Sequence, residues 1–173
     1  MENLRFCPKC GQEKLLWNNI TKWSCSNCDF VLYHNTAAAV AVIIRCKDEV
    51  FFTLRNQQPG KGKLDLPGGF TDPAESSEET CARELNEELG LNIDPKAFSY
   101  LGSQPNIYPY KSIDYNTLDL FYQYDVEEKF EITLEESEIS EGCWIKWSDI
   151  DLEKIAFESQ KKFLKSYFKI KFS

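Results

Sequence analysis

The chain has 173 residues, of which 42% are hydrophobic, which is enough for one ordinary domain with a sizeable core and a small additional unit. Its formal net charge of -8 argues against broad nucleic-acid binding, because such binding needs an excess of lysine and arginine to displace counterions. No stretch approaches the roughly 18 apolar residues of a membrane span, and the first residues do not resemble a signal peptide, so we expect a cytoplasmic protein that binds no membrane.

Two C-x-x-C pairs lie near the N-terminus, Cys7–Cys10 and Cys25–Cys28, and fourteen residues separate them. Four thiolates at such a spacing favour tetrahedral Zn²⁺, and a site filled by four protein ligands has no open position for chemistry. The alternatives are disulfides, which the absence of a secretion signal disfavours, and unpaired core thiols, which do not explain the paired spacing. We therefore predict a structural zinc site in a zinc ribbon over residues 1–34, with a hairpin between the pairs.

The main domain is expected to occupy residues 35–173. Residues 36–45 form a continuous apolar run that is typical of a strand buried on both faces, and residues 50–55 read as a second strand. After a polar loop rich in glycine and lysine, residues 64–66 form a short strand that leads into a pair of glycines. The single histidine, His34, excludes a mechanism that needs a histidine pair.

A helix is predicted to follow these glycines. Thr71 and Asp72 are helix-cap types, Pro73 suits a first helical position, and Gly90 is a typical C-terminal stop. We therefore predict a helix that begins at Pro73 and ends before Gly90. Helical spacing gives it an apolar stripe that docks on the core, formed by Cys81, Leu85 and Leu89.

The predicted helix is strongly acidic. Residues 69–91 contain six glutamates and a single cation, Arg83, and helical spacing places Glu84, Glu87 and Glu88 on one face. Clustered oxygen ligands without histidine or thiol suit Mg²⁺ or Mn²⁺, ions that bridge protein carboxylates to substrate phosphates. The predicted chemistry is attack of water on a phosphorus atom. The alternative is a solvated acidic helix, the usual meaning of a charge run.

The spacing of residues 69–91 fills every fixed position of the pattern G-x5-E-x7-R-E-U-x-E-E-x-G-U, where U is aliphatic. It thereby resembles the Nudix box. The resemblance implies an α/β fold, the Nudix α/β/α sandwich with a mixed sheet, preceded here by the zinc ribbon. It further implies that Glu84, Glu87 and Glu88 hold the divalent metal, that the Gly69 carbonyl adds a ligand, and that Glu75 and Arg83 pair to fix the loop against the helix.

Beyond the box, residues 98–104 and 117–126 read as strands. The segment between them contains three tyrosines and two prolines, and it looks too long for a hairpin turn, so we predict a loop. A stiff aromatic loop beside a catalytic helix is a good platform for stacking a nucleobase. The alternative is a loop that packs only by its own rings.

A zinc ribbon followed by a Nudix box resembles the NADH pyrophosphatase branch of the family. That branch carries S-Q-P-W-P-F-P-x-S, of which residues 103–105 match, whereas Asn106 replaces the tryptophan and the rest matches only with an insertion. The resemblance suggests Gln104, Tyr108 and Tyr110 as substrate-binding residues. The later segment E-I-S-E-G-C-W is similar to one in which the branch carries a further catalytic glutamate, which implies that Glu138 is a metal ligand or the general base.

The C-terminal part reads as a strand over residues 144–147 and a helix capped by Ser159. Apolar residues of this helix recur at helical spacing and should pack on the core. The remaining cysteines lie singly in apolar surroundings and are expected to be small core residues.

Together these features predict a metal-dependent Nudix hydrolase that cleaves the pyrophosphate bond of a nucleoside diphosphate linked to another moiety, of the NADH or ADP-ribose type. The cofactors would be catalytic Mg²⁺ or Mn²⁺ and structural Zn²⁺. Two alternatives stay open: a non-catalytic nucleotide-binding regulatory module, and a hydrolase of nucleotide-capped RNA. A homodimer is expected from the resemblance.

Overall fold

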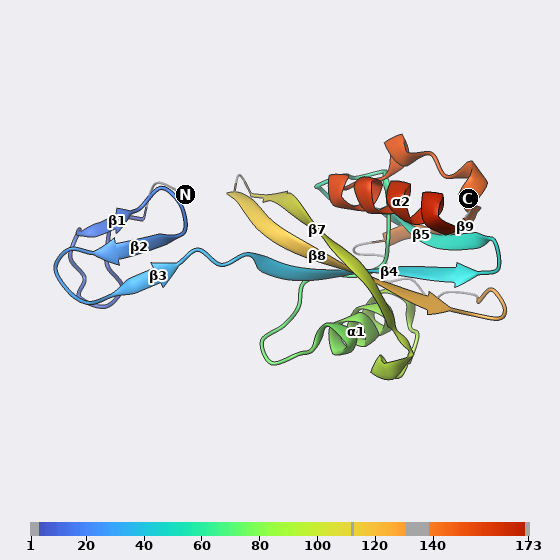
Figure 1. Cartoon of the computed structure of the whole chain (residues 1–173), viewed down its shortest axis with the longest axis horizontal. Coiled ribbons are helices and arrows are strands. Elements are labelled where there is room, and N and C mark those ends of the chain that lie inside the picture. Colours follow the sequence, from blue (N-terminus) through green and yellow to red (C-terminus); the bar gives the residue numbers. More distant parts are fainter. Residues whose placement is uncertain (1–3, 112, 131–138, 172–173) are drawn as a thin grey trace. The chain divides into compact units, whose positions relative to one another are not determined.

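The computed structural model describes residues 4–111, 113–130 and 139–171. The chain forms two compact units that divide between Thr36 and Ala37 (Figure 1). Each unit has its own sheet and its own core. The assignment of residues 1–34 and 35–173 to two functional domains stays a prediction.

The first unit is a three-stranded antiparallel sheet in the order β1-β2-β3. Its strands are β1 (Leu15–Trp17), β2 (Lys22–Cys25) and β3 (Val31–Tyr33). The predicted hairpin is β1 and β2, and β3 is an additional strand. The Asn18 side chain accepts hydrogen bonds from the backbone N–H groups of three following residues, which fixes the β1–β2 turn.

The second unit is built on a six-stranded mixed sheet whose main path runs β6-β5-β4-β8-β7, with β9 paired to β5. Its strands are β4 (Ala37–Cys46), β5 (Glu49–Arg55), β6 (Leu64–Asp65), β7 (Ser99–Tyr110), β8 (Ile113–Asp125) and β9 (Ile139–Lys146). Strands β4 and β8 are parallel, and the other pairs are antiparallel. The short helical turns are η1 (Pro95–Ala97), η2 (Trp147–Asp149) and η3 (Leu152–Lys154). The predicted last strand therefore begins before residue 144, and Trp147 already belongs to η2.

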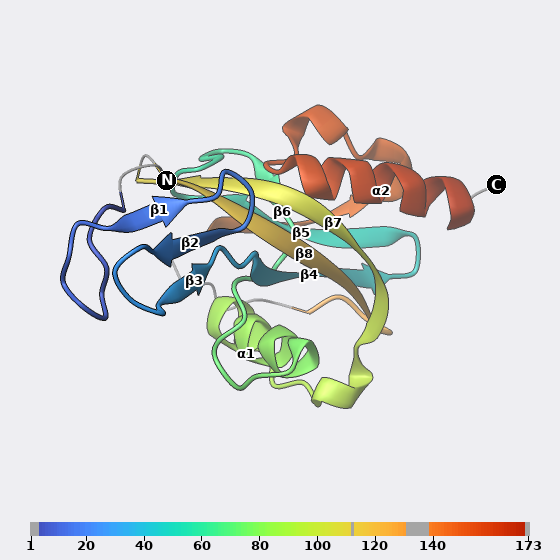
Figure 2. The same cartoon turned by 60° about the vertical axis from the view of Figure 1, so that its left-hand side comes forward.

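Two helices, α1 (Ser77–Leu89) and α2 (Glu158–Lys171), cover opposite faces of this sheet (Figures 1 and 2). Val42 of β4 packs with Leu85 of α1, whereas its neighbour Ile43 packs with Leu164 of α2, and all four side chains are fully buried. Alternate residues of β4 thus supply two cores, which explains its continuous apolar run. The predicted α/β/α sandwich with a mixed sheet is confirmed. Within the described residues, no helix is long and apolar enough to cross a membrane.

The start of α1 differs from the prediction. The helix begins at Ser77, and the Ser76 side chain caps it while Glu79 bonds back to the Ser76 backbone N–H. This capping box satisfies two of the unpaired N–H groups of the first turn. Ala74 has a φ of 73°, so the chain at Pro73 is a turn and not a helix. Gly90 ends the helix in the left-handed conformation, as predicted.

The segment predicted to be a loop is a long hairpin instead. Strands β7 and β8 stay paired as far as Tyr110 opposite Ile113. Because β7 lies at the edge of the sheet, it accepts Pro105 and Pro109, which lack the N–H donor of an inner strand. The turn follows at Lys111, whose φ is 47°. Prolines that suggested a loop are therefore compatible with an edge strand.

The predicted cap of the last helix is also wrong. Ser159 lies within the first turn of α2, and its hydroxyl donates to the buried carboxylate of Asp119 at 2.5 Å. Phe163, Leu164 and Tyr167 are buried against the sheet at the predicted helical spacing.

Candidate functional site

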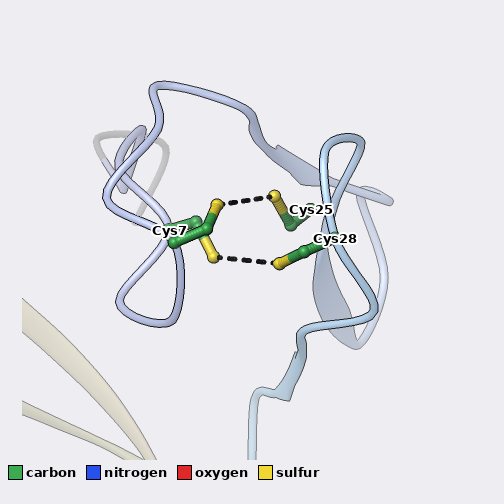
Figure 3. A group of neighbouring side chains, drawn as sticks. Cys7, Cys25 and Cys28 are labelled. Carbon is green, nitrogen blue, oxygen red and sulfur yellow. Dashed lines mark hydrogen bonds between the residues drawn. The ribbon is translucent and has the colours of Figure 1, made fainter.

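The four cysteines of the first unit form a compact cluster (Figure 3). Their sulfur atoms all lie within 4.8 Å of one another, with 3.7 Å between Cys7 and Cys28 and 3.8 Å between Cys10 and Cys25. Ligands at a Zn–S distance of about 2.3 Å around a tetrahedral ion are about 3.8 Å apart. A disulfide would need about 2.05 Å, and all seven cysteines are free. The cluster is consistent with a zinc site, as predicted.

The backbone of the first unit favours the thiolate form of Cys10, whereas desolvation and the neighbouring sulfur atoms raise the pKa of Cys28 to about 12. A hydrogen bond from the backbone at Gln12 lowers the pKa of Cys10 to about 7. The Cys25 sulfur accepts from the Asn27 N–H at 3.4 Å. Both contacts arise inside the two tight turns that the C-x-x-C spacing produces.

The second unit contains an open cleft of about 430 Å³. One wall carries box residues from α1 and the turn before it, and the other wall carries residues of the sheet and the segment before α2. The lining residues from the box and the glycine just before it are Gly68, Gly69, Phe70, Asp72, Arg83, Glu84, Glu87 and Glu88.

Arg83 ties the box together. Its Nε and Nη2 donate to both oxygens of Glu75, at 2.8 Å and 3.1 Å, and Nη2 also donates to the Phe70 carbonyl at 3.0 Å. This bidentate pair joins the turn to the helix. The Arg83 hydrogen bond lowers the pKa of Glu75 to about 2. The predicted Glu75–Arg83 pairing thus occurs in the structure.

The same guanidinium contacts two of the three clustered glutamates. Its Nη1 donates to Glu84 at 2.8 Å and to Glu87 at 3.0 Å. The Glu84 and Glu87 carboxylates therefore face a common point that a cation already occupies. Within the described residues, no group of three carboxylates gathers as closely as the four thiols. Three carboxylates are nevertheless the donor set that Mg²⁺ or Mn²⁺ prefers, so the residues fit such an ion.

Adjacent glycines let the backbone approach these glutamates. The Gly68 N–H donates to Glu88 Oε2 at 3.1 Å, and the Gly69 carbonyl accepts from the Val40 N–H at 2.8 Å. A Cβ at Gly69 would lie 2.4 Å from Glu84 Oε1, and one at Gly68 would lie 2.2 Å from the Val40 carbonyl oxygen. Gly68 has no room for a side chain because the obstacle is backbone, whereas a side chain at Gly69 would displace the Glu84 carboxylate. The Gly69 carbonyl oxygen keeps a second lone pair for a metal.

The opposite wall contains a buried polar network that the sequence did not predict. Asp65 accepts from Arg55 Nη1 at 2.5 Å and from Gln160 Nε2 at 2.6 Å. Asp119 accepts from Thr117 at 2.7 Å and from Ser159. Burial raises the pKa of Asp65, and the Arg55 guanidinium opposes this shift. The available signal was an aspartate between two leucines in each of two predicted strands.

Beside the cleft lies a second cavity of about 410 Å³, which we call the aromatic pocket. Its lining residues are Ala37, Phe70, Tyr108, Tyr110 and Tyr115. The Phe70 and Tyr108 rings meet edge to face with 5.4 Å between their centroids. Both residues also line the cleft, so the two cavities share a wall.

The predicted substrate residues fall in different places. Tyr108 lines both cavities, whereas Tyr110 lines only the aromatic pocket. Gln104 lies opposite Asp119 in the β7–β8 ladder and is not among the described residues that line either cavity. Glu138 lies outside the described residues, so its predicted role as metal ligand or general base stays a prediction.

The NUDIX domain family model matches residues 34–167 of the chain. The chain is similar to the NAD-capped RNA hydrolase NudC of Haemophilus influenzae (strain PittGG), at 30% identity over 83% of this chain and 52% of that protein. It is also similar to the NAD-capped RNA hydrolase NudC of Vibrio parahaemolyticus serotype O3:K6, at 31% identity over 62% of this chain and 40% of that protein. The chain thus spans about half the length of these relatives, or less.

Solved structures share the fold at lower identity. A NUDIX hydrolase from Nitrosomonas europaea matches with a TM-score of 0.64 and 21% identity, over 94% of this chain and 92% of that chain. The NUDIX domain of Shewanella oneidensis NrtR, solved in complex with ADP ribose, matches with a TM-score of 0.62 and 19% identity, over 80% of this chain and 90% of that chain.

Proposed function

Because the chain belongs to the Nudix family, we propose that it is a hydrolase dependent on Mg²⁺ or Mn²⁺ that cleaves the pyrophosphate bond of a nucleoside diphosphate linked to another moiety. The observation that carries this proposal is that Glu84, Glu87 and Glu88 line the same cleft as the two closely packed glycines. The printed names of the relatives and of the neighbouring structures, which include NAD-capped RNA hydrolase and ADP ribose, support a substrate of the NADH or ADP-ribose type.

The box residues would have two roles, metal binding and positioning. Glu84, Glu87 and Glu88, with the Gly69 carbonyl, would hold the ion, which when bound neutralises charge on the diphosphate. Glu75 and Arg83 would keep the turn and the helix in a fixed relation, so that the carboxylates stay at the wall of the cleft. Arg83 contacts Glu84 and Glu87 through one nitrogen. It would release both carboxylates when a divalent cation, which carries twice its charge, binds them.

The first unit would hold structural Zn²⁺ through Cys7, Cys10, Cys25 and Cys28. With four protein ligands such an ion has no open position, so it would stabilise the unit and take no part in the reaction. We further propose a cytoplasmic location, where reduced thiols are available as ligands. A homodimer is also proposed, and light scattering on the purified chain tests it.

The decisive experiment measures release of mononucleotide from ADP-ribose and from NADH with Mg²⁺ or Mn²⁺. Glu87→Gln and Glu88→Gln should each lower kcat by on the order of 100-fold, because a bound metal supplies several kcal/mol of transition-state stabilisation. Glu128→Gln is the matched control, since Glu128 is exposed and does not line the cleft. Full activity of both box variants at saturating Mg²⁺ would overturn the proposal. Nucleotide binding without turnover would favour a regulatory module instead.

A second candidate function is hydrolysis of nucleotide-capped RNA, which the names of the two NudC relatives favour. The net charge of -8 disfavours broad RNA affinity but is compatible with recognition of a short terminal cap. Comparing NAD-capped RNA with free NAD at equal concentration tests this candidate. A kcat/KM for the capped RNA well above that for the free dinucleotide would establish it.

A further inference from the structure

The short segment of residues 66–69, which leads from β6 into the box, is held by β4 on one edge only. The Pro67 carbonyl accepts from the Val42 N–H, and the Gly69 carbonyl accepts from the Val40 N–H, each at 2.8 Å. The pairing of β6 with β5 ends before this segment begins. Within the described residues, no strand pairs with the other edge of the segment. That edge therefore depends on side chains for its support.

Two side chains accept hydrogen bonds from the backbone of this segment. The Leu66 N–H donates to Gln160 Oε1 at 3.2 Å, and the Gly68 N–H donates to Glu88 Oε2 at 3.1 Å. Pro67, which lies between them, has no N–H to donate. Glu88 is also a proposed metal ligand, so an ion competes with the Gly68 N–H for its oxygen atoms. Gln160 is not a proposed ligand, and its bond to Leu66 does not depend on the ion.

The amide group of Gln160 is paired at both ends. Gln160 lies in the first turn of α2, is 4% exposed and lines the cleft. While its Oε1 accepts from Leu66, its Nε2 donates to Asp65 Oδ1 at 2.6 Å. The amide thus binds two consecutive residues just before the glycines of the cleft, and each of its ends has a partner of the matching kind. A buried side chain that is paired in this way keeps one orientation, which makes it a precise support.

Ser159, the neighbouring residue of α2, is attached to a different strand. It is 1% exposed, and its hydroxyl donates to Asp119 Oδ2 of β8 at 2.5 Å. Within the described part of the chain, Ser159 forms no hydrogen bond to residues 66–69. Two adjacent side chains of one helical turn therefore hold different parts of the sheet. Loss of either bond loosens the docking of α2, but only loss of the Gln160 bonds also releases the segment.

From these contacts we infer that Gln160 is a positioning residue for the proposed reaction. By holding Leu66 it keeps residues 66–69 in place, so that the Gly69 carbonyl and the Gly68 N–H stay beside the glutamates of the cleft. It acts through the backbone and not on the reacting atoms. This inference rests on the proposed hydrolase function and adds to it a residue outside the box, 94 positions from Leu66 in the chain.

Binding of Mn²⁺ to the full chain without substrate, measured by electron paramagnetic resonance, tests the inference independently of turnover. Gln160→Met keeps the length of the side chain but removes its amide. It should raise the Mn²⁺ dissociation constant by about tenfold, the usual size of one lost buried hydrogen bond. Hydrogen exchange of the Leu66 amide should be slow in the unaltered chain and faster in this variant.

Steady-state kinetics with saturating Mg²⁺, and with ADP-ribose and NADH as substrates, give a second readout. In Gln160→Met, kcat should fall by about tenfold while KM changes little, because a displaced Gly69 carbonyl weakens interactions that matter in the transition state. Gln160→Leu, which also lacks the weak acceptor of the methionine sulfur, should behave in the same way.

Ser159→Ala is the matched control for the docking of α2. Like the Gln160 variants, it removes a buried hydrogen bond from the first turn of α2, so all of them should lower the melting temperature. Ser159→Ala should nevertheless leave the Mn²⁺ affinity and the exchange of the Leu66 amide as they are in the unaltered chain. Equal weakening of Mn²⁺ binding in Ser159→Ala would overturn the inference, because the docking of α2 as a whole would then be the cause.

An unchanged Mn²⁺ dissociation constant in folded Gln160→Met or Gln160→Leu overturns the inference and leaves the hydrolase function standing. A Leu66 amide that exchanges as fast as an exposed one in the unaltered chain also overturns it, and this measurement needs no variant. A higher KM with unchanged kcat and unchanged Mn²⁺ affinity would make Gln160 a substrate contact instead. Turnover of neither compound by the unaltered chain overturns the proposed function, and this inference with it.

Discussion

The two candidate metal sites differ in how closely their described ligand atoms lie, because only the cysteine cluster brings all of its ligand atoms together. In the first unit, two short turns bring four sulfur atoms within 4.8 Å of one another. In the second unit, the side chains of Glu84 and Glu87 extend to Arg83, and they share its single positive charge with Glu75. Short cysteine side chains on tight turns are gathered by the backbone alone. Long glutamate side chains can turn to whichever cation is present.

The largest expected effect concerns the cysteine cluster. Replacing one ligand, as in Cys25→Ser, should release the zinc and unfold the first unit, because binding of structural zinc contributes about 10–16 kcal/mol in zinc-finger peptides. Metal analysis would measure the loss of zinc, and hydrogen exchange of β1 to β3 would measure the unfolding of the first unit. We expect β4 in the second unit to stay protected. Cys143→Ser is the control, since Cys143 lies outside the cluster. Zinc that stays bound to Cys25→Ser would contradict the comparison.

The second unit should depend instead on ion pairs between protein side chains. Asp65 is 7% exposed and pairs with Arg55, so Asp65→Ala should lower the free energy of unfolding by about 3 kcal/mol, because the partly buried guanidinium loses its carboxylate and keeps only the Pro59 carbonyl. Urea denaturation monitored by tryptophan fluorescence measures this loss. Asp114→Ala removes an exposed aspartate from the β7–β8 hairpin and should have little effect. An equal decrease in the free energy of unfolding in both variants would show that the Arg55–Asp65 pair stabilises the fold no more than an exposed aspartate does.

Magnesium without nucleotide should have a smaller effect than zinc. At ten times its dissociation constant, a ligand that binds only the folded state stabilises it by about 1.4 kcal/mol. Calorimetry with and without Mg²⁺ should therefore show a rise in the melting temperature of the second unit of only a few degrees, and Glu87→Gln should reduce that rise. A rise that is unchanged in Glu87→Gln would place the ion elsewhere.

The smallest effect is the pH dependence of the Glu75–Arg83 pair. Arg83 lowers the pKa of Glu75 from 4.5 to about 2, so this pair stabilises the folded state fully above pH 4.5 and loses its effect as the pH falls toward 2. Melting curves between pH 2 and pH 6 should show that Glu75→Gln is less stable than the unaltered chain at pH 6, and that the difference narrows toward pH 2. A constant difference over this range would rule out the carboxylate as its cause.

Local motifs were predictable from the sequence, and long-range pairing was not. The cysteine pairs and the Glu75–Arg83 tie depend on residues that are close in the chain, so their spacing alone indicates the contacts. The Asp65–Gln160 bond joins residues 95 positions apart, and no local pattern reports such a contact. The β7–β8 hairpin was missed for another reason. Its prolines read as loop residues until the strand is known to lie at an edge.

The start of α1 is set by a local signal that is stronger than the proline on which the prediction relied. Ser76 and Glu79 form the S-x-x-E capping box, but the prediction relied on Pro73 and the residues before it. A reciprocal pair of hydrogen bonds at Ser76 fixes the first turn, whereas proline at a first position only tolerates a helix. The glutamates of the cleft kept their predicted face because the period of the helix, and not its first residue, determines it.

The two prolines of β7 also affect how copies of this protein meet. An exposed edge strand normally presents a row of N–H donors to which another chain can add. Pro105 and Pro109 interrupt that row, so intermolecular extension of the sheet, and the aggregation that follows from it, is blocked along this hairpin. Self-association at β7 would therefore have to rely on side chains such as Ile107, which is 59% exposed, and not on a continuous backbone ladder.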